Sequence, residues 1–202
     1  MATVAPRLLG PADHGERMSL EEFEQADVEP GYLYELARGV LEVSEVPDEF
    51  PHGMLVYWFY RLLGRFDDAN PGLIQRFGGG SEYRLVIPAL ESGRHPDIAV
   101  TLKGAPKNVR GRRPPALAIE IVSPGRDAHD RDYKAKREEH LAYGMSEYWI
   151  VDPYERRVIV LLRDGGVWVE RVFTKPEDSA SGLVLPGLVA PLAELWKIGE
   201  ER

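Results

Sequence analysis

The chain contains no cysteine, so disulfide bonds and thiolate metal ligands are both excluded. This absence fits the reducing cytoplasm, where we expect the protein to reside. The longest apolar run, Met54 to Tyr60, is far shorter than the roughly 18 residues that a membrane span needs. No charged segment followed by an apolar one opens the chain, so we expect neither a secretory signal nor contact with a membrane.

Basic residues are also in short supply, with 25 Lys and Arg against 33 Asp and Glu and a formal net charge of −8. This balance argues against a large nucleic-acid surface, because affinity for phosphates comes mainly from Lys and Arg. Residues 103–113 nevertheless form a basic stretch without an acid, which contains Lys103, Lys107, Arg110, Arg112 and Arg113. A basic loop on an acidic body is compatible with a narrow phosphate-binding groove and equally with a solvated loop.

The length of 202 residues suffices for one domain with a sizeable core. Residues 1–17 are rich in Pro, Ala, Gly and charge, which predicts a disordered leader before a single domain over 18–202. Strands are predicted at 32–36, 40–46, 82–87, 97–102, 116–122, 148–151, 158–162 and 167–173. Helices are predicted to begin at Ser19, at Pro51, at Asp127 or Asp130, and at Pro191. This order predicts an α+β fold, a mixed sheet flanked by helices.

The predicted helix over 51–66 is apolar around most of its circumference. Such a helix is buried on several sides or forms a subunit contact. We therefore hypothesise a homodimer.

Two carboxylates stand inside apolar, β-branched runs that are typical of buried strands. Asp97 lies in the run 95–100 and Glu120 in the run 117–124. An ionised carboxylate in such a place costs several kcal/mol unless a cation or a set of donors compensates it. Two such strands side by side would direct both acids to one point and form a divalent-metal site.

Lys136 is the third residue of interest, on the helix that follows the Glu120 strand. Helical periodicity places it on one stripe with Tyr133, His140 and Tyr143. A helix directly after the strand packs back on the sheet, so Lys136 can reach toward the two acids. A lysine near a metal can position water and stabilise charge on a scissile phosphate.

Each of these residues also has a structural interpretation. Asp97 could cap a turn, Glu120 could form an ion pair with Lys136, and Lys136 could extend to water from the inner helix face. His52, at a helix start, could contact phosphate or carry a proton, or have no function. No HxxxH or HExxH pair exists, which disfavours a zinc hydrolase.

Taken together, these motifs resemble the PD-(D/E)XK nuclease superfamily and, more narrowly, the bacterial Uma-two family of restriction-endonuclease-like proteins. The resemblance covers most of the chain and follows the family order. The matching blocks are 18–23, 34–36, 39–42, 52–53, 96–100, 120–124, 131–132, 136–137 and 147–153.

The resemblance implies a restriction-endonuclease-like core with Mg²⁺-dependent phosphodiester hydrolysis, in which Mn²⁺ can substitute. Asp97 and Glu120 match the metal ligands, completed by the carbonyl of Ile121. The superfamily usually carries its lysine two residues after the glutamate, where this chain has Val122, and the lysine has moved to Lys136. Glu35 matches an acid often placed beside the metal, although the sequence leaves it equally open as a surface hairpin residue.

The leading hypothesis is a metal-dependent endonuclease that cleaves DNA, with RNA as the alternative substrate. A second hypothesis is a non-catalytic nucleic-acid or protein-binding module that retains the fold. A third is a metal-dependent hydrolase of another phosphate ester.

Overall fold

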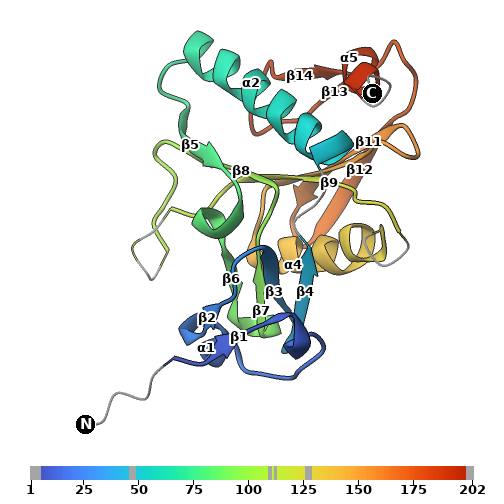
Figure 1. The fold of residues 1–202 in the computed structure, drawn as a ribbon. Helices are drawn as coiled ribbons and strands as arrows, with labels where there is room; N and C mark the ends of the chain where they lie inside the picture. The colour runs from blue at the N-terminus through green and yellow to red at the C-terminus, as the bar shows by residue number, and fades with distance from the viewer. Residues whose placement is uncertain (1–5, 46–48, 109–110, 112, 126–128, 199–202) are drawn as a thin grey trace.

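The computed structural model of the chain describes residues 6–45, 49–108, 111, 113–125 and 129–198. The expected helix cap Asp127 and the basic residues Arg110 and Arg112 lie outside the described residues. Figure 1 shows a layered arrangement in which a central sheet lies between helices, with a smaller sheet below.

The central sheet has six strands in the order β12-β11-β10-β9-β8-β5 (Figure 1). Strands β9 and β10 are parallel and the other neighbours are antiparallel. The bounds are β5 Ile74–Gly78, β8 Ile98–Leu102, β9 Leu117–Ile121, β10 Glu147–Asp152, β11 Arg157–Asp164 and β12 Val167–Phe173. The α+β class with a mixed sheet flanked by helices is therefore confirmed.

One face of this sheet is covered by helices α2, Met54–Ala69, and α5, Leu192–Ile198, with the short hairpin of β13, Ser179–Ser181, and β14, Val189–Pro191. Phe59 and Trp149 meet there edge to face, with ring centroids 6.3 Å apart. Leucines, isoleucines and valines from β8 to β11 fill the rest of this layer. Burial of such side chains contributes about 1.5–3 kcal/mol each, so this layer supplies much of the stability.

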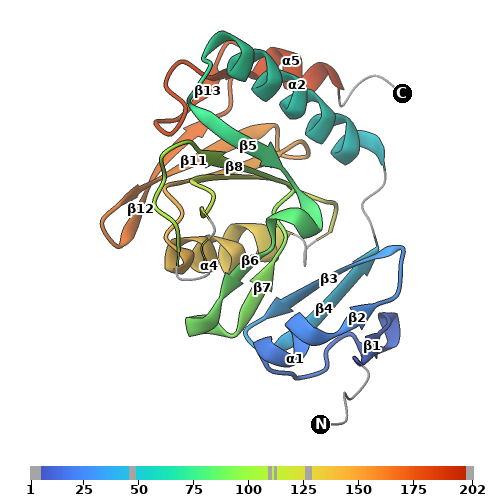
Figure 2. The ribbon, with the colours of Figure 1, turned by 90° about the vertical axis from the view of Figure 1, so that its left-hand side faces the viewer.

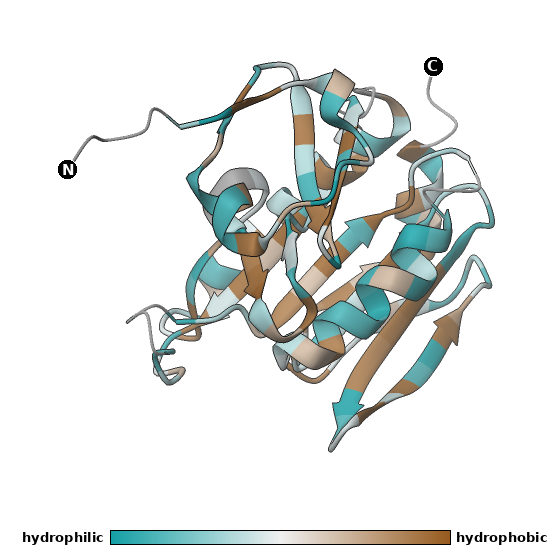
Figure 3. Ribbon diagram, turned by 90° about the horizontal axis from the view of Figure 1, so that it is seen from below, coloured by the Kyte–Doolittle hydropathy of each residue, from teal (hydrophilic) through white to brown (hydrophobic). Residues whose placement is uncertain are grey.

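The opposite face is covered by α4, Lys136–Tyr143, which continues a wider helical turn, η5, Arg131–Ala135. Gly144, with φ 94°, ends the helix in the left-handed conformation that glycine adopts without strain. Seen from this side in Figure 3, the helix is mostly hydrophilic while the strands behind it are mostly hydrophobic. The sheet therefore has one apolar face and one mixed face.

The smaller sheet has the order β4-β3-β7-β6 and lies beyond α4 in Figure 2. Its strands are β3 Tyr32–Ala37, β4 Val40–Glu45, β6 Leu85–Ile87 and β7 Ser92–Arg94. Helix α1, Leu20–Gln25, begins at Ser19 with the predicted capping box, in which Ser19 and Glu22 bond each other's backbone amides. Short turns complete the chain: η1 Pro11–Asp13, η2 Glu49–Gly53, η3 Gly80–Tyr83 and η4 Pro88–Leu90.

The N-terminal segment from Pro6 to Arg17 differs from the expected disordered leader. Strand β1, Leu8–Leu9, pairs with β2, Asp27–Val28, and Leu9 is completely buried beside Leu20. The buried Leu9 side chain and backbone hydrogen bonds to Asp27, Glu29 and Leu41 hold the segment. These partners lie outside the segment, so no pattern within its polar sequence predicts them. Residues 1–5 lie outside the described residues.

Helix α2 is amphipathic rather than buried all round. Leu55, Phe59 and Leu63 are fully buried, whereas Met54 and Tyr57 are 42% and 56% exposed. The homodimer stays a prediction, for which this exposed strip is the surface in question. Across the described part of the chain, no helix combines the length and apolarity that crossing a membrane requires.

Candidate active site

Asp97 and Glu120 meet on adjacent antiparallel strands. Ile98 pairs with Ile119, which places Asp97 opposite Glu120. The amide of Ile121 donates to Asp97 Oδ2 at 2.8 Å, and the amide of Asp97 lies 3.4 Å from Glu120 Oε2. The two acids and the backbone of Ile121 thus form one compact group at the start of β8.

The glycine run 78–80 positions the start of β8. A Cβ on Gly79 would clash with the carbonyl oxygen of Asp97, so any side chain there would push the strand away. The amide of Gly80 donates to the carbonyl of Pro96 at 3.3 Å. Close backbone approach to the candidate site is what requires glycine here.

Lys136 reaches the two acids from α4. Its Nζ lies 3.0 Å from Glu120 Oε2, 3.6 Å from Asp132 Oδ1 and 3.9 Å from Glu35 Oε1. Burial alone would lower the pKa of Lys136, but the neighbouring carboxylates raise it above its ordinary value. The side chain is 3% exposed. It is a buried, charged ammonium rather than one that extends to water.

Glu35 joins the same group and is not a surface hairpin residue. Its side chain is 5% exposed, its Oε1 accepts from the amide of His95 at 2.7 Å, and its Oε2 accepts from Arg94 at 3.3 Å. Burial raises the pKa of Glu35, but Lys136, Arg94 and the amide of His95 together lower it to about 2. Glu35 is therefore ionised at neutral pH.

Arg94 is a buried ion-pair centre that the sequence did not single out. Its guanidinium is completely buried and bonds Glu139 of α4 and Glu42 of β4, each at 2.5 Å, as well as Glu35. It thereby joins the smaller sheet to the helix that carries Lys136. The sequence of the helix does indicate part of this cluster. Asp132, Lys136 and Glu139 are spaced four and three residues apart, which places their side chains on one helix face.

His52, for which the sequence leaves a role and no role both open, lies beside the two acids. Its Nε2 lies 3.1 Å from Asp97 Oδ2. Burial lowers the pKa of His52, but the hydrogen bond and charge of Asp97 outweigh it, and the pKa ends above its ordinary value. A donor on a carboxylate fixes its orientation, as hydrogen bonds around metal ligands commonly do.

The buried charges of this region do not balance. Four carboxylates are almost completely buried, which are Glu35, Glu120, Asp132 and Glu139, against two equally buried cations, Arg94 and Lys136. Arg131, which is 27% exposed, adds a third cation 3.4 Å from Asp132, so the carboxylates still outnumber the cations. Burial, with Glu120 and Glu35 nearby, raises the pKa of Asp132 against the pull of Lys136, as expected where negative charge is crowded. An additional cation would therefore be stabilised here.

One oxygen of the group has no hydrogen-bond partner among the described residues. Glu120 Oε1 is buried without a hydrogen bond, and His140 Nε2, also unbonded, is 3.6 Å away. With Asp97 and the carbonyl of Ile121 it offers the hard oxygen ligands that Mg²⁺ prefers. Within the described ranges no three His, Asp or Glu side chains are arranged to hold a metal, but Mg²⁺ commonly uses one or two carboxylates and keeps several waters.

The fold resembles a known structure. The chain superposes with a TM-score of 0.68 on a protein from Anabaena variabilis ATCC 29413, titled a putative nuclease belonging to DUF820. The two are 18% identical, and the match covers 90% of this chain and 98% of that one. At this identity the likeness shows a shared fold. No match was found among curated proteins.

A protein family matches the sequence itself. The family called Uma2, described as "Putative restriction endonuclease", matches residues 20–193, which include all the residues of the candidate site. The resemblance inferred from the sequence motifs is thereby confirmed. This chain belongs to the Uma2 family of restriction-endonuclease-like proteins.

Proposed function

We propose that this protein is a metal-dependent endonuclease that hydrolyses DNA phosphodiester bonds, using Mg²⁺ or, in its place, Mn²⁺. One observation carries the proposal: Asp97 and Glu120 meet on neighbouring strands, with the buried ammonium of Lys136 3.0 Å from Glu120. Two acids on inner strands of a mixed sheet, together with a lysine, supply the ligands and the charge that phosphodiester hydrolysis needs. The family description supports the nuclease class.

Hydrolysis forms a bond between a water oxygen and phosphorus and breaks the bond from phosphorus to the leaving oxygen, which gains a proton. Asp97, Glu120 and the carbonyl of Ile121 would hold the divalent ion. When bound, the ion would supply Lewis-acid polarisation of the phosphate and a more acidic water.

The other side chains act on this arrangement. Lys136 holds a positive charge beside Glu120 and can donate a hydrogen bond to the attacking water or to a phosphate oxygen. His52 Nε2–H donates to Asp97 Oδ2 and so orients that carboxylate. Glu35 and Asp132 hold Lys136 in place by their charges.

A non-catalytic binding module is the second candidate. The net charge of −8 favours it, as does Val122 at the position where the superfamily usually has its lysine. In that case the buried ion pair of Glu120 and Lys136 would serve only the fold.

A cleavage assay separates the two candidates. Plasmid DNA, single-stranded DNA and RNA are incubated with Mg²⁺, Mn²⁺ or EDTA and with wild type, Asp97→Ala, or the control Asp68→Ala on the exposed end of α2. We expect metal-dependent cleavage that Asp97→Ala reduces at least about a thousandfold, or about 4 kcal/mol of activation free energy, and that Asp68→Ala leaves intact. Cleavage that survives in Asp97→Ala would disprove the assigned site.

Metal binding is tested independently of cleavage. Mg²⁺ or Mn²⁺ should raise the melting temperature of wild type but not of Glu120→Ala, because only a ligand that binds the folded state stabilises it. Absence of both cleavage and metal-induced stabilisation would favour the binding module.

A further inference from the structure

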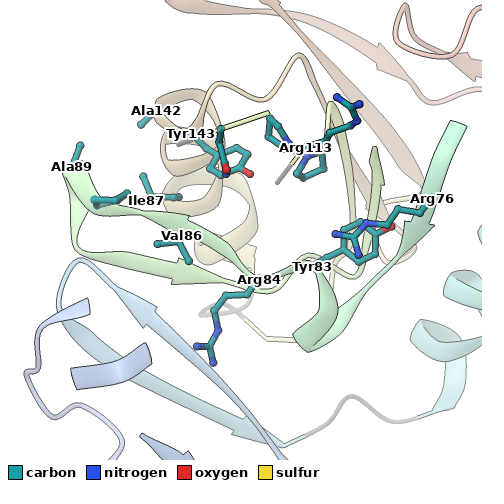
Figure 4. Close-up of a pocket in the computed structure, with 13 residues that line it drawn as sticks. Arg76, Tyr83, Arg84, Val86, Ile87, Ala89, Arg113, Ala142 and Tyr143 are labelled. Carbon is teal, nitrogen blue, oxygen red and sulfur yellow. The ribbon is translucent and has the colours of Figure 1, made fainter. Parts of the chain in front are cut away.

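A pocket of about 340 Å³ opens against the C-terminal end of α4 (Figure 4). Its other walls are β6 with the turn that follows it, and the segment 113–115 that leads into β9. The volume lies in the range of small-ligand pockets, about 300–1,000 Å³. None of its lining residues takes part in the proposed hydrolysis, so the pocket calls for a role of its own.

The charged groups of the pocket are all cationic. None of the described residues that line it is an Asp or Glu, although acids outnumber bases in the chain. Arg84 turns away in Figure 4, since its Nε donates to His95 and its guanidinium lies 4.6 Å from the centre of the Phe23 ring. Arg76 and Arg113 remain as the pocket's two guanidinium groups, which favours an anionic ligand.

Both guanidinium groups are held by the protein. The guanidinium carbon of Arg76 lies 4.4 Å from the centre of the Tyr83 ring, a cation–π stack that Figure 4 shows. Arg113 Nη1 donates to the carbonyl oxygen of Ala105. A planar guanidinium held in this way can bind phosphate with two hydrogen bonds or stack on a base.

Apart from Asn108, the remainder of the pocket is apolar or aromatic. Ile87, Pro114 and Tyr143 lie on its walls. Burial raises the pKa of Tyr143, so its phenol stays neutral. A flat, weakly polar body joined to an anionic group suits such a mixed lining, and a nucleotide has both parts.

The pocket also lies in reach of the candidate active site. Arg76 pairs with Thr101, four residues beyond Asp97, or about 13 Å along β8 at about 3.3 Å per residue. The Tyr83 ring packs on Gly78, and Gly78 pairs with Ala99, which lies between Asp97 and Thr101. A nucleic-acid strand that places one phosphate at Asp97 and follows β8 would reach the pocket within a few nucleotides.

We propose that this pocket binds one unpaired nucleotide of a single-stranded nucleic acid, with its phosphate on Arg76 and Arg113 and its base against Tyr143. The base must be unpaired, because it enters a pocket walled by a hairpin, a helix end and a proline segment. The proposal rests on the proposed nuclease function and deepens it, since the enzyme would act at single-stranded segments or ends.

Binding is measured by fluorescence anisotropy in EDTA, where metal-dependent cleavage does not occur. The probes are labelled oligothymidylate, oligouridylate and a duplex of the same length. Arg76→Gln and Arg113→Gln are compared with Arg61→Gln, a matched control whose guanidinium also stacks on a tyrosine, Tyr57, at 5.9 Å on α2. The comparison uses whichever of the two single strands the wild type binds more tightly. We expect each pocket variant to bind that strand about tenfold more weakly than wild type, since each variant loses a charge-assisted hydrogen bond to phosphate.

The salt dependence gives a second readout. The slope of log affinity against log salt should fall by about 0.7 for each phosphate of a single strand that a variant no longer neutralises. Single-strand affinity unchanged in both pocket variants, or no single-strand binding by wild type, would overturn the proposal. An equal weakening on the duplex, or an equal weakening in Arg61→Gln, would also overturn it, because the effect would then be general electrostatics.

The cleavage assay and this binding assay can fail separately. Metal-dependent cleavage that needs Asp97, together with wild-type single-strand affinity in both Arg76→Gln and Arg113→Gln, would remove the pocket proposal alone. Pocket-dependent binding without any cleavage would remove the proposed nuclease function and leave the single-strand site.

Discussion

Two buried glutamates on adjacent strands of the central sheet lie on opposite faces and behave differently. Glu147, on the face under α2 and α5, accepts from the indole of Trp149 at 2.6 Å and from the amides of Leu183 and Val184 at 2.6 and 2.9 Å. Glu120, on the α4 face, pairs with Lys136 and keeps one oxygen without a hydrogen bond among the described residues.

The difference suggests a criterion that separates a structural acid from a candidate functional one. Both side chains are about 1% exposed, so burial does not separate them. Hydrogen bonding does separate them: neutral donors bond both oxygens of Glu147, whereas Glu120 lies among other acids and its Oε1 accepts no hydrogen bond from the described residues. An unsatisfied buried polar atom in a native protein commonly marks a functional site or an absent ion.

The largest expected effect on stability comes from replacing Glu147, the acid whose hydrogen bonds are complete. Glu147→Ala leaves the Trp149 indole and two backbone amides buried without an acceptor, at about 1–3 kcal/mol for each such donor. We expect the free energy of unfolding to fall by about 3–5 kcal/mol in urea titrations, with metal-induced stabilisation unchanged. The control Glu155→Ala is exposed and should change little. A decrease below about 1 kcal/mol would show that Glu147 is not a structural anchor.

A pH titration probes the crowded charges on the α4 face. The pKa of Glu35 is lowered from its ordinary value of 4.5 to about 2, because Lys136 and Arg94 outweigh its burial. As pH falls below about 4.5 the unfolded chain takes up this proton first, so stability from ionised Glu35 is full above that pH and is lost toward pH 2.

The matching variant is Glu35→Gln, which resembles the protonated acid. We expect it to be less stable than wild type at pH 7 by about 3 kcal/mol, and the difference to shrink steadily as pH falls from about 4.5 toward about 2. Urea unfolding at several pH values measures it. A difference that does not change with pH would mean that the charge of Glu35 contributes nothing to folding.

Much of the sheet and the three central site residues could be predicted from the sequence, because local patterns determine them. Alternation placed Asp97 and Glu120 in strands, and helical periodicity placed Lys136 on an inward face. The order strand, strand, helix then brings the three together. These signals each lie within a few consecutive residues.

The rest depends on contacts distant in the sequence. Strand β7, Ser92–Arg94, has no apolar alternation. Its pairing with β3 joins Leu36 to Gly93, 57 positions apart, and the ion pair between Arg94 and Glu35 spans 59 positions. The proximity of His52 to Asp97 spans 45 positions. No local pattern encodes such distances, so these residues were visible only in the folded chain.

The smallest expected effect sharpens the comparison within the α4 face. Lys136→Met, Glu120→Gln and the double variant form a cycle whose coupling free energy reports the buried pair 3.0 Å apart. We expect a coupling free energy of about 1–2 kcal/mol. Each single change leaves one buried charge of the pair without its partner, whereas the double change removes both charges. The control is the exposed pair of Arg38 and Glu138, whose side chains lie 2.6 Å apart and whose acid is also on α4. This pair should couple by at most about 0.5 kcal/mol. Equal coupling in the two cycles would mean that burial adds nothing to the Glu120–Lys136 pair. The unsatisfied oxygen of Glu120 would then be the one feature that separates Glu120 from a structural acid.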